Sequence, residues 1–421
     1  MHRIIAAALA ATPCVAVAQA QDNIATGQPV GPALTLDQAV TIAGGSAPAA
    51  DAAQAGIDAA QAARTVAGLR PNPEIQSQVE NVVGSGPYGG VRQAETTVGI
   101  NIPIELGGKR SARIAIADAQ FHRAALVAAI TQADIRLQVT TLYVDAIAAE
   151  RRLVTARDQL RIAHDALNAA QIRVQAGRAS PLEEQRADVA TRNADAEVQK
   201  AQRLAQALRA NLERRVGQPI AGALDGSALD HLPPPSLGPT RTTSADTLAL
   251  AAADADLAIA DAGVRLARSQ RIPDVTVGPA VRRLSATNDT AAVLSLSIPI
   301  PLFNAGQAAV AQASAQRVRA EAQRRMTSLD VEQAITDAQA EADNAATAAR
   351  NAGGPALAAA QEAARIARIG YREGKFGQLD LLDAERTLSQ TRLAAIDALA
   401  SYQNARARLE RLIAPAPVQG N

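Results

Sequence analysis

The sequence contains the same unit twice, and this duplication constrains the fold more than any other feature of the chain. Four short motifs recur in the same order at spacings of 200, 196, 197 and 197 residues: Pro73-Glu74-Ile75 as Pro273-Asp274-Val275, Ile102-Pro103-Ile104 as Ile298-Pro299-Ile300, Gly177-Arg178 as Gly374-Lys375, and Leu212-Glu213-Arg214 as Leu409-Glu410-Arg411. The 421 residues therefore predict two structural repeats, over residues 34–216 and 246–413. A linker rich in Pro and Gly is expected at 217–245 and a flexible tail at 414–421.

Each repeat opens with an Ala-rich segment that predicts a helix. In the first repeat this segment runs from Thr35 to about Leu69, and Thr35 with Gln38 matches the capping-box pattern. Pro71 and Pro73 end the helix, because proline lacks an amide hydrogen and restricts the residue before it.

The next segments alternate apolar and polar residues with a period of two, which predicts β-strands. The clearest alternation covers Ala94 to Glu105 and, in the second repeat, Leu294 to Ile300, while weaker alternation before each predicts a hairpin partner. One face of these strands carries Val98, Ile100, Ile102, Ile104, Leu294, Leu296, Ile298 and Ile300. The pattern is typical of a membrane-spanning strand and equally of a half-buried antiparallel sheet, so both interpretations stay open.

A very long helical arm follows each hairpin. Residues 108–176 contain no proline, and at ~1.5 Å per residue such an arm would be roughly 100 Å long. The chain breaks at Gly177 to Pro181 and returns as a second helix, and the second repeat has the same arrangement, with a kink expected at Asn351 to Pro355. A helix of this length cannot bury itself in a globular core, so its apolar stripe must face other helices.

Residues 1–20 predict a secretory signal, and residues 21–33 an N-terminal extension. His2 and Arg3 precede a short apolar run, and small residues at Ala16, Ala18 and Ala20 offer cleavage sites. The run is too short to anchor the chain, although an N-terminal membrane helix is the competing interpretation. The sequence's single cysteine, Cys14, lies in this segment in a context that argues against lipid attachment, so no disulfide or thiolate site is expected.

Composition excludes several functions. The chain has 42 basic and 41 acidic residues, and Arg3 is the only one of them in the predicted signal. The chain without the signal is therefore neutral, whereas a nucleic-acid partner would require a basic surplus. Aromatic residues make up 2 % of the chain, with no Trp, which disfavours the thick core of a globular enzyme. The four His residues are scattered, and the sequence has no HExxH, P-loop or GxSxG motif. We therefore expect no catalytic residues, no dedicated metal site and no cofactor.

Several motifs resemble the TolC-type family of outer-membrane efflux proteins. They include Leu34-Thr-Leu-Asp-Gln-Ala-Val40 and the stretch Tyr371-Arg-Glu-Gly-Lys-Phe-Gly-Gln-Leu-Asp-Leu-Leu-Asp-Ala-Glu-Arg-Thr-Leu388. Pro71-Asn-Pro-Glu74, Glu80-Asn81 and Pro103-Ile-Glu-Leu-Gly-Gly-Lys-Arg110 are similar to the heavy-metal, CzcC-like branch, which serves resistance-nodulation-division pumps. The resemblance covers Leu34 to about Leu412.

The resemblance implies a mixed, mainly α fold in which a homotrimer forms a twelve-stranded outer-membrane β-barrel continued by a periplasmic α-helical tunnel. The apolar strand face would then contact outer-membrane lipid, and Glu74, Gln76, Gln78 and Glu80 would line the barrel lumen. The implied function is a passive exit duct, opened by a periplasmic adaptor and supplied by an inner-membrane pump. The duplication agrees with this arrangement, because two hairpins in each of three copies close a sheet without free edges.

The turns between the long helices hold the candidate gate. Asp380 and Asp383 are three residues apart at a helix start, where they share a face and suit the positive helix end. A spacing of 197 places Glu183 and Arg186 at the equivalent positions of the first repeat. The resemblance implies that these turns close the periplasmic tip, where a ring of carboxylates would favour cations. Helix capping and solvated ion pairs explain the same residues without a gate.

The surrounding residues have implied roles of two kinds. Candidates for bonds that latch neighbouring helices are Tyr371, Arg186, Lys375 and Arg178. The turns expected to receive the adaptor contain Gly177, Gly374 and Gly377.

Other functions fit parts of the sequence. Within the same class, the chain would be an exit duct for drugs or for proteins of a type I secretion system. A soluble periplasmic coiled-coil adaptor or scaffold would also explain the long arms. An adaptor, however, should carry one helical hairpin flanked by separate β-domains, whereas this chain has two equivalent hairpins.

Overall fold

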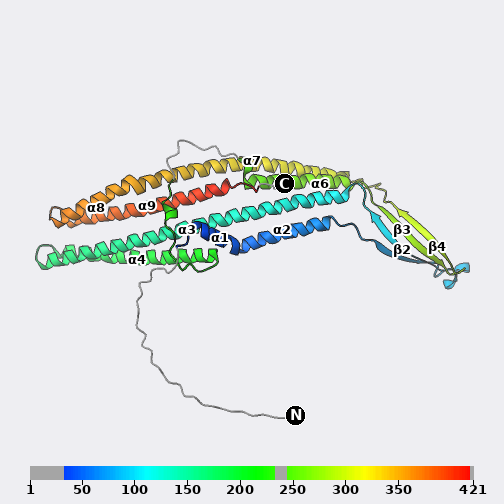
Figure 1. Cartoon of the computed structure of the whole chain (residues 1–421), viewed down its shortest axis with the longest axis horizontal. Helices are drawn as coiled ribbons and strands as arrows, with labels where there is room; N and C mark the ends of the chain where they lie inside the picture. Colours follow the sequence, from blue (N-terminus) through cyan, green and yellow to red (C-terminus); the bar gives the residue numbers. More distant parts are fainter. Residues whose placement is uncertain (1–32, 233–243, 418–421) are drawn as a thin grey trace, which may run out of the picture.

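The computed structural model describes residues 33–232 and 244–417, so the predicted signal, Cys14 and part of the predicted linker lie outside the described residues. The described chain is elongated, with helical hairpins at one end and a sheet at the other (Figure 1). Its main helices are α1 (Leu36–Ser46), α2 (Pro48–Ala67), α3 (Lys109–Gln175), α4 (Pro181–Val216), α5 (Ser227–Asp230), α6 (Leu248–Ser269), α7 (Gln307–Asn351), α8 (Leu357–Arg372) and α9 (Gln378–Leu412). Its strands are β1 (Glu74–Glu80), β2 (Glu95–Ile104), β3 (Val275–Leu284) and β4 (Asp289–Ser297).

The first repeat begins with the predicted capping box. The Thr35 hydroxyl accepts from the Gln38 amide at 3.3 Å, and the Gln38 side chain accepts from the Thr35 amide at 3.0 Å. The prediction of one helix over residues 35–69 is wrong, because α1 and α2 are separate helices. Ala47 between them is extended, with φ −77° and ψ 125°, as expected for a residue that precedes a proline.

The long arms of the two repeats differ in continuity. The first arm, α3, is one helix of 67 residues. The second arm is interrupted between α7 and α8 by a π-helical turn at Ala352–Ala356, where Gly354 leaves helical geometry (φ −104°, ψ −105°) ahead of Pro355. This confirms the predicted kink and gives its cause, since the proline ring and its missing amide prevent regular α-helical bonding.

The helices lie side by side in a single layer (Figure 1). Toward the hairpin tips α4 packs against α3, α3 against α9, and α9 against α8. Toward the sheet the order is α2, α3, α6 and α7. Each interior helix therefore has neighbours on both sides, while α2 and α4 form one edge of the layer and α7 and α8 form the other.

The largest buried cluster lies midway along the arms and centres on Tyr143. Its hydroxyl donates to the Leu34 carbonyl at 2.6 Å and accepts from the Asp225 amide at 3.0 Å. Burial raises the pKa of Tyr143 to about 12, so the phenol is neutral at physiological pH. The described part of the predicted linker is part of this core, since Ile220, Leu224 and Leu229 are buried in it. Residues 415 and 416, expected in a flexible tail, pair with residues 246 and 247.

The four strands form one antiparallel sheet in the order β1-β2-β3-β4. Its register places Ile75 opposite Ile100 and Val98 opposite Val281, so the apolar residues of neighbouring strands share a face. The prediction for the last strand is corrected at its end: β4 stops at Ser297, and Ile298 and Ile300 follow it in irregular backbone.

Charged residues fix the sheet to the helices. The Asp274 carboxylate, directly before β3, accepts from the Lys109 ammonium at 2.7 Å and from the Leu106 amide at 3.0 Å. Arg113 of α3 pairs with Glu105, directly after β2. The start of α3 is thus bonded to the helix-proximal ends of strands from both repeats.

Replacing Tyr143 with Phe tests the importance of the midpoint cluster. We expect Tyr143→Phe to lower the free energy of unfolding by about 1–2 kcal/mol, because the buried hydrogen bonds to Leu34 and Asp225 are lost with little change in packing volume. Thermal or denaturant unfolding of the purified protein measures this. The control Tyr88→Phe alters a side chain that is half exposed and should change stability by less than about 0.5 kcal/mol. Equal effects of the two variants would contradict the assignment.

Candidate functional site

The two hairpin tips are tight turns that depend on glycine at one position each. Gly177 has φ +69° and Gly374 has φ +72°, in the left-handed region that other residues rarely adopt. Gly377, also predicted as a turn glycine, has φ −75° and is instead the N-cap of α9. The backbone of the turns therefore requires glycine at positions 177 and 374, whereas the extended backbone of Gly377 does not.

Glu183 connects the two hairpins of the chain. Its carboxylate lies 3.0 Å from the Arg173 guanidinium and accepts from the Tyr371 hydroxyl at 3.3 Å. The Arg173 guanidinium also lies over the Tyr371 ring, 5.2 Å from its centroid, and the Tyr371 hydroxyl raises the pKa of Arg173 above its ordinary value. The Glu183 side chain is only 17 % exposed, so these bonds are partly shielded from water. One carboxylate thus holds α3, α4 and α8 together.

Two contacts at this junction were not predicted from the sequence. Arg173 is ten residues before Glu183 and becomes its neighbour only when the hairpin folds back. Gln378 is buried and donates to the Glu183 carbonyl at 3.3 Å, which ties α9 to α4. A Cβ at Gly370 would collide with the Phe376 ring, so the second turn closes over that glycine.

The remaining predicted gate and latch residues are exposed in the single chain. Asp380 caps its own helix by accepting from the Gly377 amide at 3.0 Å, and it makes no bond to Glu183. The other four side chains make no hydrogen bond or ion pair within the described chain: Asp383, Arg178, Arg186 and Lys375. The structure of one chain therefore joins Glu183 and Tyr371, and leaves the two aspartates facing solvent.

The two faces of the sheet differ in chemistry. On the polar face Asn101 donates to Gln76 at 2.7 Å. Further along, Glu80 and Glu95 are directly opposite each other, a like-charge pair that is unfavourable by itself. Arg282 compensates it, at 3.3 Å from Glu80 and 2.8 Å from Glu95. The predicted lumen residues Glu74, Gln76, Gln78 and Glu80 all lie on this face.

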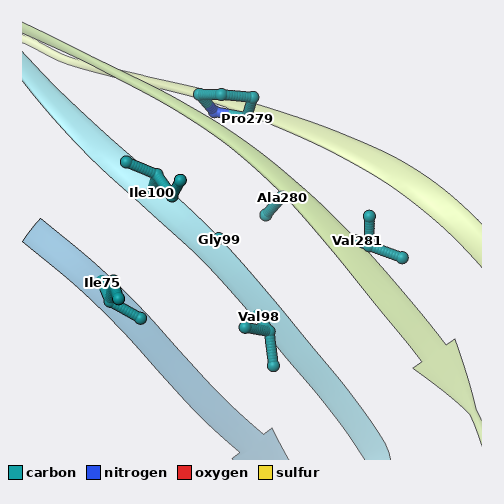
Figure 2. A pocket seen from close by; sticks show the side chains of 7 residues that line it. All are labelled: Ile75, Val98, Gly99, Ile100, Pro279, Ala280 and Val281. Carbon is teal, nitrogen blue, oxygen red and sulfur yellow. The ribbon is translucent and has the colours of Figure 1, made fainter.

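The opposite face is apolar and exposed. Val98, Ile100, Ile102 and Ile104 are each between 42 and 49 % exposed, and Leu294 and Leu296 are 76 and 65 % exposed. A hollow of about 530 Å³ lies between Ile75 on β1, Val98 and Ile100 on β2, and Pro279 and Val281 on β3. Figure 2 shows these side chains. The β2–β3 register skips the positions beside Pro279, which has no amide hydrogen to donate. A continuous apolar surface of this kind on an exposed sheet marks a site of contact with protein or membrane.

The comparison with known proteins decides the family. The profile described as "Outer membrane efflux protein" matches residues 42–218 and 243–414, one segment in each repeat. The chain belongs to the outer membrane efflux protein family. It is 32 % identical over 386 residues to the cobalt-zinc-cadmium resistance protein CzcC of Cupriavidus metallidurans, covering 90 % of each chain.

Solved structures have the same fold. The chain is similar to a membrane protein from Pseudomonas aeruginosa, with a TM-score of 0.74 and 20 % identity over 92 % of this chain and 91 % of that one. It is also similar to the open state of the MtrE outer membrane channel of Neisseria gonorrhoeae, with a TM-score of 0.73 and 20 % identity over 90 and 88 % of the two chains. The family match and the similarity to CzcC confirm the TolC-type resemblance and its heavy-metal branch.

Family membership assigns the chain to efflux across the outer membrane, and its members are passive channels rather than enzymes. In the described part of the chain, no helix is both long and apolar enough to cross a membrane. Nor do the described residues contain a group of three or more His, Cys, Asp or Glu side chains placed to hold a metal ion.

Removing the charge of Glu183 tests the junction between the hairpins. In Glu183→Gln we expect amide hydrogen exchange in both tip turns to accelerate about fivefold, because roughly 1 kcal/mol of charged hydrogen bonding is lost from a partly exposed site. Glu184→Gln is the matched control, since Glu184 has no ion pair in the described chain. Identical exchange in the two variants would show that Glu183 does not join the hairpins.

Proposed function

We propose that this protein is the outer-membrane exit duct of a tripartite efflux system that exports divalent heavy-metal cations. The observation that carries the proposal is the similarity to CzcC, a cobalt-zinc-cadmium resistance protein, over nine-tenths of both chains. A duct for organic drugs or a type I secretion duct would share the fold, but the similarity to a metal-resistance protein favours cations as the cargo. An inner-membrane resistance-nodulation-division pump supplies the energy, and a periplasmic adaptor joins the two.

In the proposed assembly three copies close a ring. One chain supplies four strands, whose outer members β1 and β4 are sheet edges with unpaired backbone groups. Pairing β4 of one copy with β1 of the next gives a twelve-stranded barrel without edges. The apolar face then contacts lipid, and the face with Glu74, Gln76, Gln78 and Glu80 lines the lumen, as expected for a membrane barrel.

The proposed gate is at the hairpin tips. Three copies bring Asp380 and Asp383 around one axis, and these side chains are free in the single chain apart from the cap made by Asp380. Carboxylates held close together in a narrow opening attract cations and repel anions. Glu183 has a different role, because its charge is already compensated by Arg173. It latches the hairpins within a protomer, with Tyr371 as its second partner.

Opening in this mechanism is mechanical. The α3–α4 and α8–α9 hairpins must move apart, which breaks the bond between Glu183 and Tyr371 in each protomer and leaves the pairing of Glu183 with Arg173, within the α3–α4 hairpin, intact. Adaptor contact at the turns of Gly177 and Gly374 would compensate these broken bonds, so the duct opens only when it is recruited. Cargo passes through without chemical change.

Neutralising both aspartates tests the gate. We expect Asp380→Asn/Asp383→Asn channels in planar bilayers to lose cation preference, measured as a smaller reversal potential in a KCl gradient, and to leak more in the closed state. The control Asp165→Asn removes a carboxylate that is exposed on α3 and, among the residues that the structure describes, pairs with Arg161. Unchanged selectivity and unchanged closed-state conductance in the double variant would refute the gate assignment.

A further inference from the structure

One arginine lies on the otherwise uncharged apolar face of the sheet. Among the residues of β1 to β4 on this face, only Arg283 carries a charge. We propose that Arg283, with Thr96 and Thr290 beside it, binds the phosphate of an anionic lipid of the outer leaflet, whose acyl chain occupies the apolar hollow of the same face. The inference rests on the proposed orientation of the sheet, with its apolar face toward lipid, and assigns a specific lipid site to that face.

Strand pairing places Arg283 at the end of the face that is farthest from the helices. Arg283 lies directly opposite Thr96 of β2 and Thr290 of β4. The next row of this face toward the helices contains Val98 opposite Val281. The face therefore changes from apolar to polar within one row, and two residues with hydroxyl groups flank the arginine.

The turn between β3 and β4 orients the Arg283 side chain. Asn288 in this turn has φ +62°, a left-handed conformation that asparagine tolerates better than most residues. Its side-chain oxygen accepts a hydrogen bond from Arg283 Nη2 at 2.8 Å. Arg283 is exposed and makes no ion pair within the described residues. Because a guanidinium has five N–H donors, the bond to Asn288 leaves donors for a ligand.

The charges at this end of the sheet are sorted by face. Arg282, the neighbour of Arg283 in the chain, points to the polar face, where it lies 3.3 Å from Glu80 and 2.8 Å from Glu95. Asp289 is aligned with Glu95 across β3 and lies on the polar face too. The apolar face of a neighbouring copy would offer no carboxylate either, since its strands have the same sequence. An anion that pairs with Arg283 on this face therefore comes from outside the protein.

The length of β3 places Arg283 at a membrane surface. The ten residues of β3 span about 33 Å at ~3.3 Å per residue. At the ~40° tilt of strands in membrane barrels this is about 25 Å along the membrane normal, which equals the height of the apolar band of such barrels. The start of β3 adjoins the helices, and its other end points away from them (Figure 1). With Val275 at the periplasmic boundary of the membrane, Arg283 lies at the outer boundary, where a lipid-facing arginine is tolerated.

The apolar hollow lies directly beside the arginine. Val98 and Val281, which form the row next to Thr96 and Arg283, also line the hollow of about 530 Å³ (Figure 2). The hollow is lined by Ile75, Val98, Gly99, Ile100, Pro279, Ala280 and Val281, none of them charged. A concave apolar surface next to a cation and two hydroxyl groups matches a lipid, which joins an acyl chain to a polar headgroup.

The headgroup that fits this site carries phosphate. A guanidinium binds phosphate through two parallel hydrogen bonds as well as by charge, and threonine hydroxyl groups can donate further bonds. Basic residues at the membrane surface are the usual partners of anionic lipid headgroups. The outer leaflet of the outer membrane is rich in lipopolysaccharide, whose lipid A portion combines phosphate groups with several acyl chains. The proposed ligand is therefore lipid A.

Lipid binding to the purified protein tests the site. Wild type and Arg283→Gln in a neutral detergent are titrated with diphosphoryl lipid A, and bound lipid is counted by native mass spectrometry. We expect Arg283→Gln to bind lipid A about tenfold more weakly, because charge-assisted bonds to phosphate are lost. Arg283→Lys keeps the charge without the planar fork and should lie between the two. The control Arg157→Gln removes an exposed arginine of α3 without an ion pair in the described chain and should bind as wild type does.

Lipid A without its phosphate groups separates headgroup recognition from acyl contact. We expect wild type and Arg283→Gln to bind this lipid equally, and inorganic phosphate at the same concentration not to displace lipid A from wild type. Displacement by inorganic phosphate would overturn the assignment to a lipid. Equal binding of diphosphoryl lipid A by wild type and Arg283→Gln, both extracted as outer-membrane oligomers, would overturn the site and leave the proposed duct intact. A wild-type protein absent from the outer membrane would overturn both.

Discussion

The helices of this molecule form a layer one helix thick, and its strands continue it as a single sheet. The rest of the structure depends on that constraint. A single layer has two faces and two edges, so its chain cannot enclose an apolar core along its whole length. The buried clusters are accordingly small, and the main one forms where α1, α5 and the inter-repeat segment cover the middle of the arms. Elsewhere burial has to come from outside the chain. In the proposed assembly it comes from lipid on the apolar side of the sheet and from other copies at the edges.

This constraint explains why the polar bonds of the chain lie where they do. Within a layer, polar pairs between neighbouring helices fix how the helices are aligned along their axes. The seam between the repeats, α3 against α9, has polar pairs at intervals, from Arg411–Asp134 near the middle to Arg392–Asp158 nearer the tips. Beyond them the next polar connection between the repeats is at Glu183. Few polar bonds therefore join the repeats at the tip, and in the proposed mechanism the tip separates without unfolding the rest of the layer.

Much of the fold could be predicted from the sequence because its strongest signals are periodic. Duplication, alternation in Ala94 to Glu105 and uninterrupted helical composition each extend over many residues. The missed features depend on single contacts. Pro48 divides the first helix within an otherwise uniform Ala-rich segment, and Ile220, Leu224 and Leu229 are core residues inside a segment whose Pro and Gly content suggests a linker. The strand β4 ends at Ser297 because its pairing with β3 ends there, although the alternation of apolar and polar residues continues to Ile300.

The candidate site could be predicted in part for the same reason. The motif around Asp380 and Asp383 marks the turn, and the repeat spacing of 197 identifies Glu183 as an equivalent position. Arg173 has no such signal, because only the fold of the hairpin brings it to within 3.0 Å of Glu183. The different environments of Glu183 and the aspartates were also not predictable, as both are acidic residues at helix starts. The Glu183 side chain is partly shielded from water and paired, whereas Asp380 and Asp383 face solvent.

The central claim is that copies of this chain close a ring in the outer membrane. The most direct test is to fractionate the membranes of cells that produce the protein and to determine the native mass of the detergent-extracted material. The account predicts three copies of the chain in the outer-membrane fraction. A soluble periplasmic monomer or dimer would contradict it, because the apolar face of the sheet and the open edges of the layer would then have to be covered in some other way.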